Sequence, residues 1–162
     1  MFKAYCEEDI NCTEPNQCTY CKEAYMAEKQ IENDIVEYLR ARGFMAVPIE
    51  NGATYDPVTK TFRRPGKNKV PGIPDIWFAG RDEYGVSITG WLEVKTPADY
   101  DYIMRHYDRL EGRLYYRDGL AKSTLKKLNH FADQIDFLNS ARGLGVIGEF
   151  VDGIGCVEEL LG

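Results

Sequence analysis

The order of periodic segments along this 162-residue chain predicts an α/β protein in which a central mixed sheet is flanked by helices. Two observations support this fold class. Apolar residues recur at helical spacing in two long segments, 22–42 and 125–141, and short apolar runs suited to strands lie between and after them. The composition, with 44% hydrophobic and 28% charged residues, is that of an ordinary soluble globular domain.

Each element has its own signal in the sequence. In the first helix, expected over 22–42, Ile31, Ile35 and Leu39 lie on one side, and Gly43 marks a C-terminal stop. The other expected elements follow in chain order: a strand over 44–49, a hairpin over 54–62 with its turn at 56–60, strands over 73–79 and 86–94, helices over 100–116 and 125–141, a strand over 145–151 and a helical turn over 157–161.

Residues 1–22 differ from the rest of the chain because they are polar and lack a clear period. Four of the five cysteines fall here: Cys6, Cys12, Cys18 and Cys21. Cys18 and Cys21 have the spacing of a metal knuckle, and four thiolates would form a closed tetrahedral zinc site. An iron–sulfur cluster or free thiols are the alternatives. We therefore divide the chain into a Cys-rich metal-binding appendage, 1–22, and a main domain, 23–162.

Charge and hydropathy limit the class of protein. The formal net charge of −6 argues against nonspecific coating of nucleic acid, although local basic patches can still dock a nucleic acid. No apolar run approaches the ~20 residues that span a bilayer, so we expect no membrane partner. Residues 1–9 lack the apolar segment of a secretory signal. We therefore expect a cytoplasmic protein without structural disulfides.

The most informative pattern is an acid at one apolar run and an acid-x-lysine triplet at the end of the next. Asp75 follows Pro74, and Glu93, Val94 and Lys95 come 93 − 75 = 18 residues later. Side chains alternate along a strand, so Glu93 and Lys95 share a face, and a hairpin would bring Asp75 to Glu93. Two carboxylates can hold Mg²⁺ or Mn²⁺ while a lysine positions or activates water for phosphodiester cleavage. The alternative is an exposed Glu93–Lys95 ion pair, with Asp75 capping a turn.

These residues resemble a known family. The segments 70–76 and 92–95 resemble the PD-(D/E)XK nuclease superfamily and, more narrowly, its VRR-NUC group, which carries Gly-x-Pro-Asp, then Glu-x-Lys on the next strand, then a helical glutamine. Gln134 fits that glutamine. The group also has a glutamate on its first helix, which Glu32 matches best and for which Glu28, on the same side, is the rival. The resemblance covers about residues 28–97 and 122–152.

The resemblance implies a restriction-endonuclease-like fold and a divalent-metal-dependent DNA endonuclease. Asp75, Glu93 and the backbone carbonyl of Val94 would bind the cation, and Lys95 would orient or deprotonate the attacking water. Glu32 would complete the outer sphere of the metal, and Gln134 would hold Lys95 or the phosphate. The family further implies branched or flapped DNA as substrate and a homodimer as the form that cuts two strands.

Two basic segments are candidates for contacting nucleic acid. The loop 63–69 leads toward Asp75, and four of its seven residues are cationic: Arg63, Arg64, Lys67 and Lys69. Within 98–121, an expected helical insertion, arginines recur every four residues with tyrosines between them: Arg105, Arg109, Arg113 and Arg117. The alternative for this second segment is a set of intrahelical ion pairs, such as Asp101 with Arg105, with the tyrosines in the core.

Two other functions remain open from the sequence. The cysteines and the basic segments also suit a non-catalytic, metal-stabilised nucleic-acid-binding module. The acid set argues against that reading, because a pure binder gains nothing from carboxylates that face phosphate. A small protein-interaction domain is the third reading, and it predicts no binding to DNA or RNA.

Overall fold

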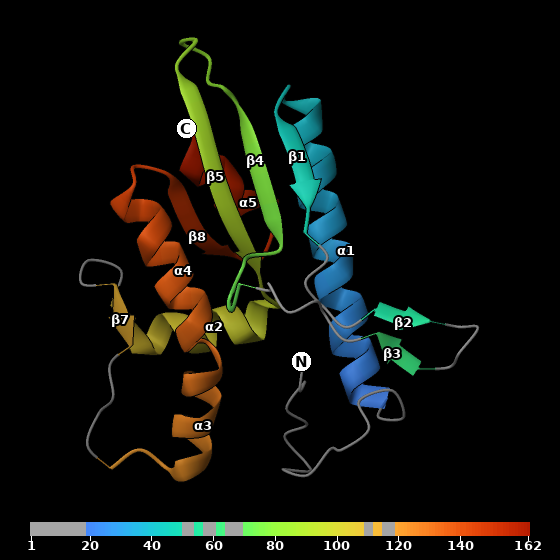
Figure 1. Ribbon diagram of the computed structural model, residues 1–162, viewed down its shortest axis with the longest axis vertical. Coiled ribbons are helices and arrows are strands. Elements are labelled where there is room, and N and C mark those ends of the chain that lie inside the picture. Colours follow the sequence, from blue (N-terminus) through green and yellow to red (C-terminus); the bar gives the residue numbers. More distant parts are fainter. Residues whose placement is uncertain (1–18, 50–53, 57–60, 64–69, 109–111, 115–118) are drawn as a thin grey trace.

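The computed structural model describes residues 19–49, 54–56, 61–63, 70–108, 112–114 and 119–162. These residues form helices and strands in the following order: α1 (Thr19–Ala41), β1 (Met45–Pro48), β2 (Thr54–Asp56), β3 (Thr61–Arg63), β4 (Ile76–Arg81), β5 (Ser87–Val94), α2 (Pro97–His106), β6 (Tyr107–Asp108), β7 (Arg113–Leu114), α3 (Lys122–His130), α4 (Ala132–Gly143), β8 (Ile147–Val151) and α5 (Ile154–Leu161). Figure 1 shows their arrangement.

The central sheet is mixed, which confirms the predicted α/β class. Its strand order is β1-β4-β5-β8, with β1, β4 and β5 antiparallel and β8 parallel to β5. The two predicted strands before and after residues 81–85 pair as a hairpin, in which Ile76 faces Leu92 and Trp77 faces Trp91. β2 and β3 form the separate small hairpin that the sequence predicts over 54–62.

Helices pack on both faces of the sheet (Figure 1). On one face, α1 and α5 bury the apolar side chains that alternate along the strands, including Phe78 and Leu92, against Ile35 and Leu39. On the other face, residues of α2 and α4 pack around Phe150 of β8. Because side chains alternate along β5, its buried Leu92 and Val94 lie on the first face while Trp91 and Glu93 point to the second.

The prediction of a helix over 100–116 is correct for its first half and wrong beyond it. α2 ends at His106, and the next residues form the short hairpin β6–β7. Gly112 takes a φ of +63°, a left-handed conformation that an α-helix does not contain, and its carbonyl accepts a hydrogen bond from the side chain of Asn139 on α4. Arg105 and Arg113 therefore do not share a helix, and no helical arginine stripe exists among the described residues. Arg109 and Arg117 lie outside them.

The helix predicted over 125–141 is two helices. α3 and α4 meet at Phe131, whose backbone N–H bonds the carbonyl of Leu128 instead of continuing the α-helical pattern. The Phe131 side chain is buried, with its ring centroid 5.7 Å from the Lys95 ammonium. The break therefore turns an aromatic ring toward the end of β5.

Several sequence predictions fall outside the described residues. Cys6, Cys12 and Cys18 do, and Cys21 lies in the first turn of α1, so the metal-binding appendage stays a prediction. Arg63 ends β3, whereas the rest of the basic loop, 64–69, lies outside. Among the helices that are described, none has the length and apolar character needed to span a bilayer.

Candidate active site

The loop before β4 lies directly against the first turn of α4. Gly72 has a φ of +69°, and a Cβ added there would fall 2.1 Å from the carbonyl oxygen of Asp133 and 2.6 Å from the backbone nitrogen of Gln134. No other residue type fits this position without moving the backbone. The glycine of the Gly-x-Pro-Asp segment therefore allows the loop that carries Asp75 to contact the helix that carries Gln134.

The Asp75 carboxylate is held at the end of the neighbouring strand. Its Oδ2 accepts a hydrogen bond of 2.9 Å from the backbone N–H of Val94, and its own carbonyl accepts one of 2.6 Å from Ile49. Asp75 is close enough to Glu93 to raise the pKa of that carboxyl. The hairpin thus brings the two acids together, as the sequence predicts.

Glu93 and Lys95 form a buried ion pair. Lys95 Nζ lies 2.6 Å from Glu93 Oε1. Glu93 is 1% exposed and Lys95 is 3% exposed. The alternative of an exposed cross-strand pair is therefore wrong. Leaving one charged partner of such a pair buried alone costs several kcal/mol, so removing either side chain should destabilise the fold. The backbone N–H of Lys95 also donates to Val151, which fixes the strand end.

Gln134 joins the same cluster from α4. Its Nε2 donates to Glu93 Oε1, the oxygen that also receives Lys95. Two buried oxygens are left without a hydrogen bond to any described residue, namely Glu93 Oε2 and Gln134 Oε1. Unpaired buried acceptors are rare and require an explanation, such as a missing ion or water.

On α1, the structure places Glu28 among the charges of the site. Lys95 lowers the pKa of Glu28 and Asp75 raises it, while burial raises it most. Glu32 lies one turn later, is 12% exposed and accepts a 2.7 Å hydrogen bond from Lys29. Lys29 in turn lowers the pKa of Asp75. Glu28 is thus in electrostatic contact with the acid–lysine cluster, and Glu32 contacts Lys29, whose charge also acts on Asp75.

The electrostatics of the cluster follow from burial. Burial raises the pKa of Glu93 to about 8, and it raises the pKa of Asp75 and Glu28 as well. Burial alone would lower the pKa of Lys95, but Glu93, Glu28 and Asp75 together raise it. Lys95 is therefore an ammonium at neutral pH, and the surrounding acids carry more negative charge than one lysine offsets once all are ionised.

A divalent cation fits this donor set. Among the residues that the structure describes, no three His, Cys, Asp or Glu side chains are grouped closely enough to ligate one metal. Mg²⁺ needs only one or two carboxylates, with water and phosphate oxygens completing its shell. Asp75 and Glu93 would supply those two carboxylates, and Glu93 Oε2 has no hydrogen-bond partner among the described residues. A cation there would also favour the ionised form of both carboxyls, whose pKa values burial raises.

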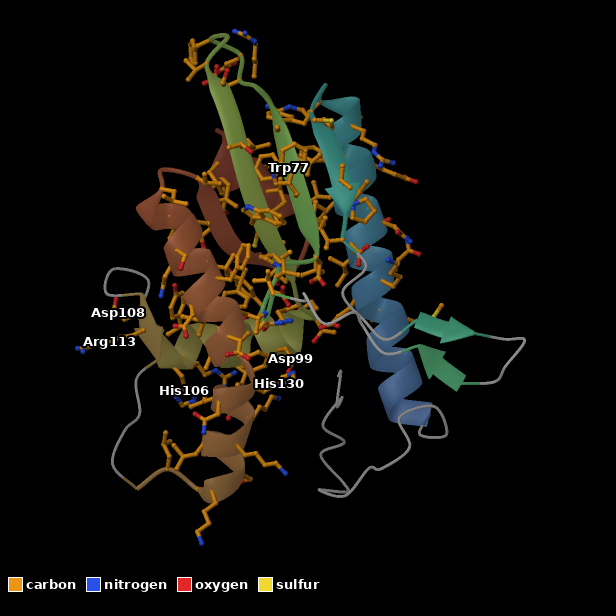
Figure 2. All side chains as sticks on the ribbon, viewed as in Figure 1. Trp77, Asp99, His106, Asp108, Arg113 and His130 are labelled. Carbon is orange, nitrogen blue, oxygen red and sulfur yellow. The ribbon has the colours of Figure 1, made fainter. Side chains whose placement is uncertain are left out.

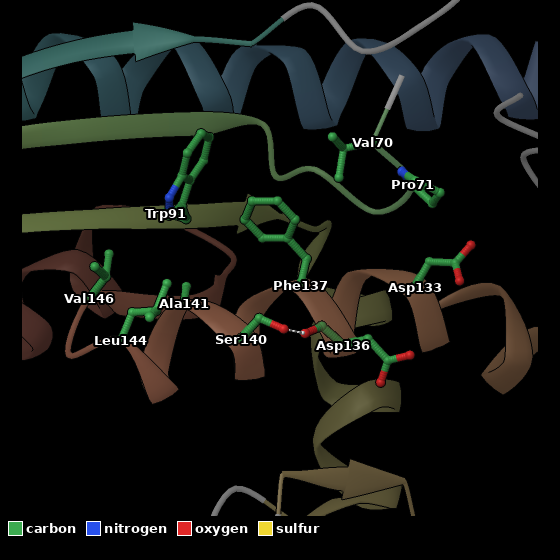
Figure 3. A pocket seen from close by; sticks show the side chains of 10 residues that line it. All are labelled: Val70, Pro71, Trp91, Asp133, Asp136, Phe137, Ser140, Ala141, Leu144 and Val146. Atoms are coloured by element: carbon green, nitrogen blue, oxygen red, sulfur yellow. Dashed lines mark hydrogen bonds between the residues drawn. The ribbon is translucent and has the colours of Figure 1, made fainter. Parts of the chain in front are cut away.

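Beside the cluster lies a hollow of about 520 Å³ (Figure 3). Its wall is largely apolar, with the rings of Trp91 and Phe137 in edge-to-face contact at 5.2 Å between centroids. Asp133 and Asp136, both on α4, also line the hollow. Trp91 lies on the same face of β5 as Glu93, two residues away. The sequence reasoning missed this hollow, and the shared strand face of Trp91 and Glu93 was the available signal.

The described fold and site define a mixed α/β protein with a buried acid–lysine cluster at one end of its sheet. Comparisons of this chain with family models, curated proteins and solved structures find no match. The nuclease interpretation therefore depends on the motifs and on the geometry of the site.

Proposed function

We propose that this protein is a divalent-metal-dependent DNA endonuclease of the PD-(D/E)XK type, with a restriction-endonuclease-like core. The observation that carries the proposal is the buried contact of Lys95 with Glu93, with Asp75 and Gln134 against the same pair. A buried lysine among acids is costly, and such perturbed clusters are typical of functional sites. The order Asp, then Glu-x-Lys on the next strand, then Gln on a helix matches the resemblance.

The residues of the site have distinct roles in this mechanism. A bound Mg²⁺ or Mn²⁺ would lower the pKa of a water molecule and offset charge on the phosphate. Asp75 and Glu93 would hold the ion, with the Val94 carbonyl as a further ligand. Lys95 would orient or deprotonate the attacking water, and its ammonium form would stabilise developing negative charge. Gln134 holds Glu93 in place.

The family resemblance also suggests a DNA substrate and an oligomeric state. Branched or flapped DNA is the proposed substrate, and a homodimer is the form proposed to cut two strands. The four N-terminal cysteines are proposed to hold structural Zn²⁺, with an iron–sulfur cluster as the other candidate. Metal analysis of the purified protein tests this last point independently of cleavage.

Cleavage assays test the proposed function. Flap, junction, duplex and single-stranded DNA are each incubated with the protein in Mn²⁺, beside Asp75→Ala, Lys95→Ala and Asp34→Ala. Asp34 is an exposed acid on α1 and serves as a matched control. We expect the wild-type protein and Asp34→Ala to cut, and both site variants to be inactive. Cleavage that survives either site substitution would refute the assignment, and tight binding without cleavage in any cation would favour the non-catalytic module.

A further inference from the structure

α3 is a basic helix in an acidic protein. Between residues 119 and 132 the chain has three lysines and one histidine and no aspartate or glutamate, although the whole chain has 26 acidic and 20 basic residues. α3 projects from the end of the molecule at which α2 lies, away from the β4–β5 turn (Figure 1). A local concentration of positive charge of this kind attracts a polyanion.

Two lysines of α3 and His130 form a stripe on its exposed side. Lys122, Lys126 and His130 follow one another at four-residue intervals, and all three are exposed. Four-residue spacing keeps side chains on one face of a helix. Leu128 is fully buried and Leu125 is partly buried, so the helix has a packed side distinct from the stripe. We call Lys122, Lys126 and His130 the α3 stripe.

Lys127 lies off the stripe and fastens the helix to α2. Its ammonium is 3.0 Å from the Asp99 carboxylate and 4.4 Å from the centroid of the Tyr102 ring. An ion pair and a cation–π contact of this kind fix the orientation of α3. The stripe therefore keeps a defined direction relative to the sheet, which a surface that guides a substrate requires.

The stripe ends beside the acid–lysine cluster. His130 is followed by Phe131, whose ring lies against the Lys95 ammonium. Gln134, about one helical turn after His130, donates a hydrogen bond to Glu93. Figure 2 shows His130 next to Asp99 at this junction. Partial loss of water around the ring lowers the pKa of His130, and the positive charge of Lys95 lowers it further, so His130 offers phosphate an imidazole N–H and not a charge. His130 thus connects the stripe to the site.

We propose that the α3 stripe is the surface along which the phosphate backbone of the DNA substrate lies as it enters the Asp75–Glu93–Lys95 site. This inference rests on the proposed nuclease function. Lys122 and His130 are eight residues apart, which is about 12 Å along a helix. At 3.4 Å of axis per nucleotide, that length matches three to four nucleotides of one strand. Lysine ammonium groups and imidazole N–H groups are suitable donors to phosphate oxygens.

The salt dependence of DNA binding tests the stripe. A labelled DNA duplex is titrated with protein without added divalent cation, which prevents metal-dependent cleavage, and anisotropy gives the affinity between about 50 and 200 mM salt. The test variant is Lys122→Gln/Lys126→Gln. The control, Arg42→Gln/Arg81→Gln, removes the same charge from exposed positions. Arg81 ends β4, about 20 Å from Asp75 at 3.3 Å per residue, and Arg42 follows α1 at that same far end.

We expect the slope of log affinity against log salt to become shallower by about 1.8 in the stripe variant, at about 0.9 per lost phosphate contact. Over a fourfold change in salt, the wild-type protein should then lose about 12-fold more affinity than the variant. In Mn²⁺ the KM for cleavage should rise in the stripe variant, and the control should match the wild type in slope and KM.

The possible failures are distinguishable. The proposed role of the α3 stripe would be overturned if the salt slope of the stripe variant equalled that of the wild type, or if the stripe and control variants lost equal slope. This holds even if the protein cuts DNA normally. If the salt slope depends on the stripe but the protein cuts no DNA in any cation, the proposed nuclease function is overturned. The α3 stripe would then still be a DNA-binding surface. Unchanged thermal melting of both double variants verifies that the comparison is between folded proteins.

Discussion

Substitution of Gly72 by alanine should damage both the stability and the site. The φ of +69° places a Cβ in the left-handed region, which costs about 1–2 kcal/mol for an L-residue. The Cβ would also fall 2.1 Å from the Asp133 carbonyl oxygen, so α4 and the loop must separate. Overpacking of this kind costs about 1–3 kcal/mol. Together, we expect the free energy of unfolding to fall by about 2–5 kcal/mol.

Gly85→Ala is the matched control for this substitution. Gly85 has a φ of +77° but no atom within 4 Å of an added Cβ, so it experiences the conformational cost without the clash. Urea unfolding of both variants, with equal m-values, gives the two free-energy losses. Gly85→Ala should lose about 1–2 kcal/mol, and the additional loss in Gly72→Ala measures the contact between the loop and α4.

The functional consequence follows from the same contact. Moving α4 away from the loop would separate Gln134 from Glu93, so cleavage by Gly72→Ala should fall at temperatures where the variant is still folded, while Gly85→Ala stays active. If the two alanine variants were equally stable and equally active, the close approach of the loop to α4 would not matter, and the reasoning would be refuted.

The remaining predictions concern the cluster itself. Gln134→Ala should weaken Mn²⁺ affinity or cleavage about 10- to 100-fold, as loss of a ligand-orienting group does, and calorimetry with Mn²⁺ measures it; an unchanged affinity and rate would contradict the contact with Glu93. The free energy of unfolding of the metal-free wild type, minus that of Glu93→Gln, should fall as pH rises from about 4.5 to about 8. In this range the unfolded chain has lost the Glu93 proton, whereas the folded protein retains it to about pH 8. Thermal melts across pH measure the difference, and a rise in it would refute the argument. Glu28→Gln should lower the pKa of Glu93 and so flatten that pH dependence, because the charge of Glu28 raises the pKa of Glu93; an unchanged pH dependence would contradict this interaction.

The β4–β5 part of the site was predictable because its determinants are local. Two strands joined by a short turn pair with each other, and strand alternation puts Glu93 and Lys95 on one face. Those rules brought Asp75 to Glu93 without further information. They could not show that the pair is buried, since burial depends on the helices that pack above it.

The failures involve contacts distant in the chain. The end of α2 at His106 depends on the turn at Gly112, which Asn139 stabilises from 27 residues away. Glu28 and Glu32 are four residues apart on one helix face, so the sequence cannot show that Glu28 interacts with Lys95 and Asp75; that interaction depends on how α1 packs.

The most direct test of the central claim is a Mn²⁺ titration of the cysteine-reduced protein, in which the paramagnetic resonance of free Mn²⁺ reports binding. The wild-type chain should bind Mn²⁺ at a site lost in Asp75→Asn and retained in the surface control Asp34→Asn, because Asp75 and Glu93 are the proposed ligands. Binding unchanged in Asp75→Asn, or no binding by the wild-type protein with DNA present, would contradict metal-dependent chemistry at this site.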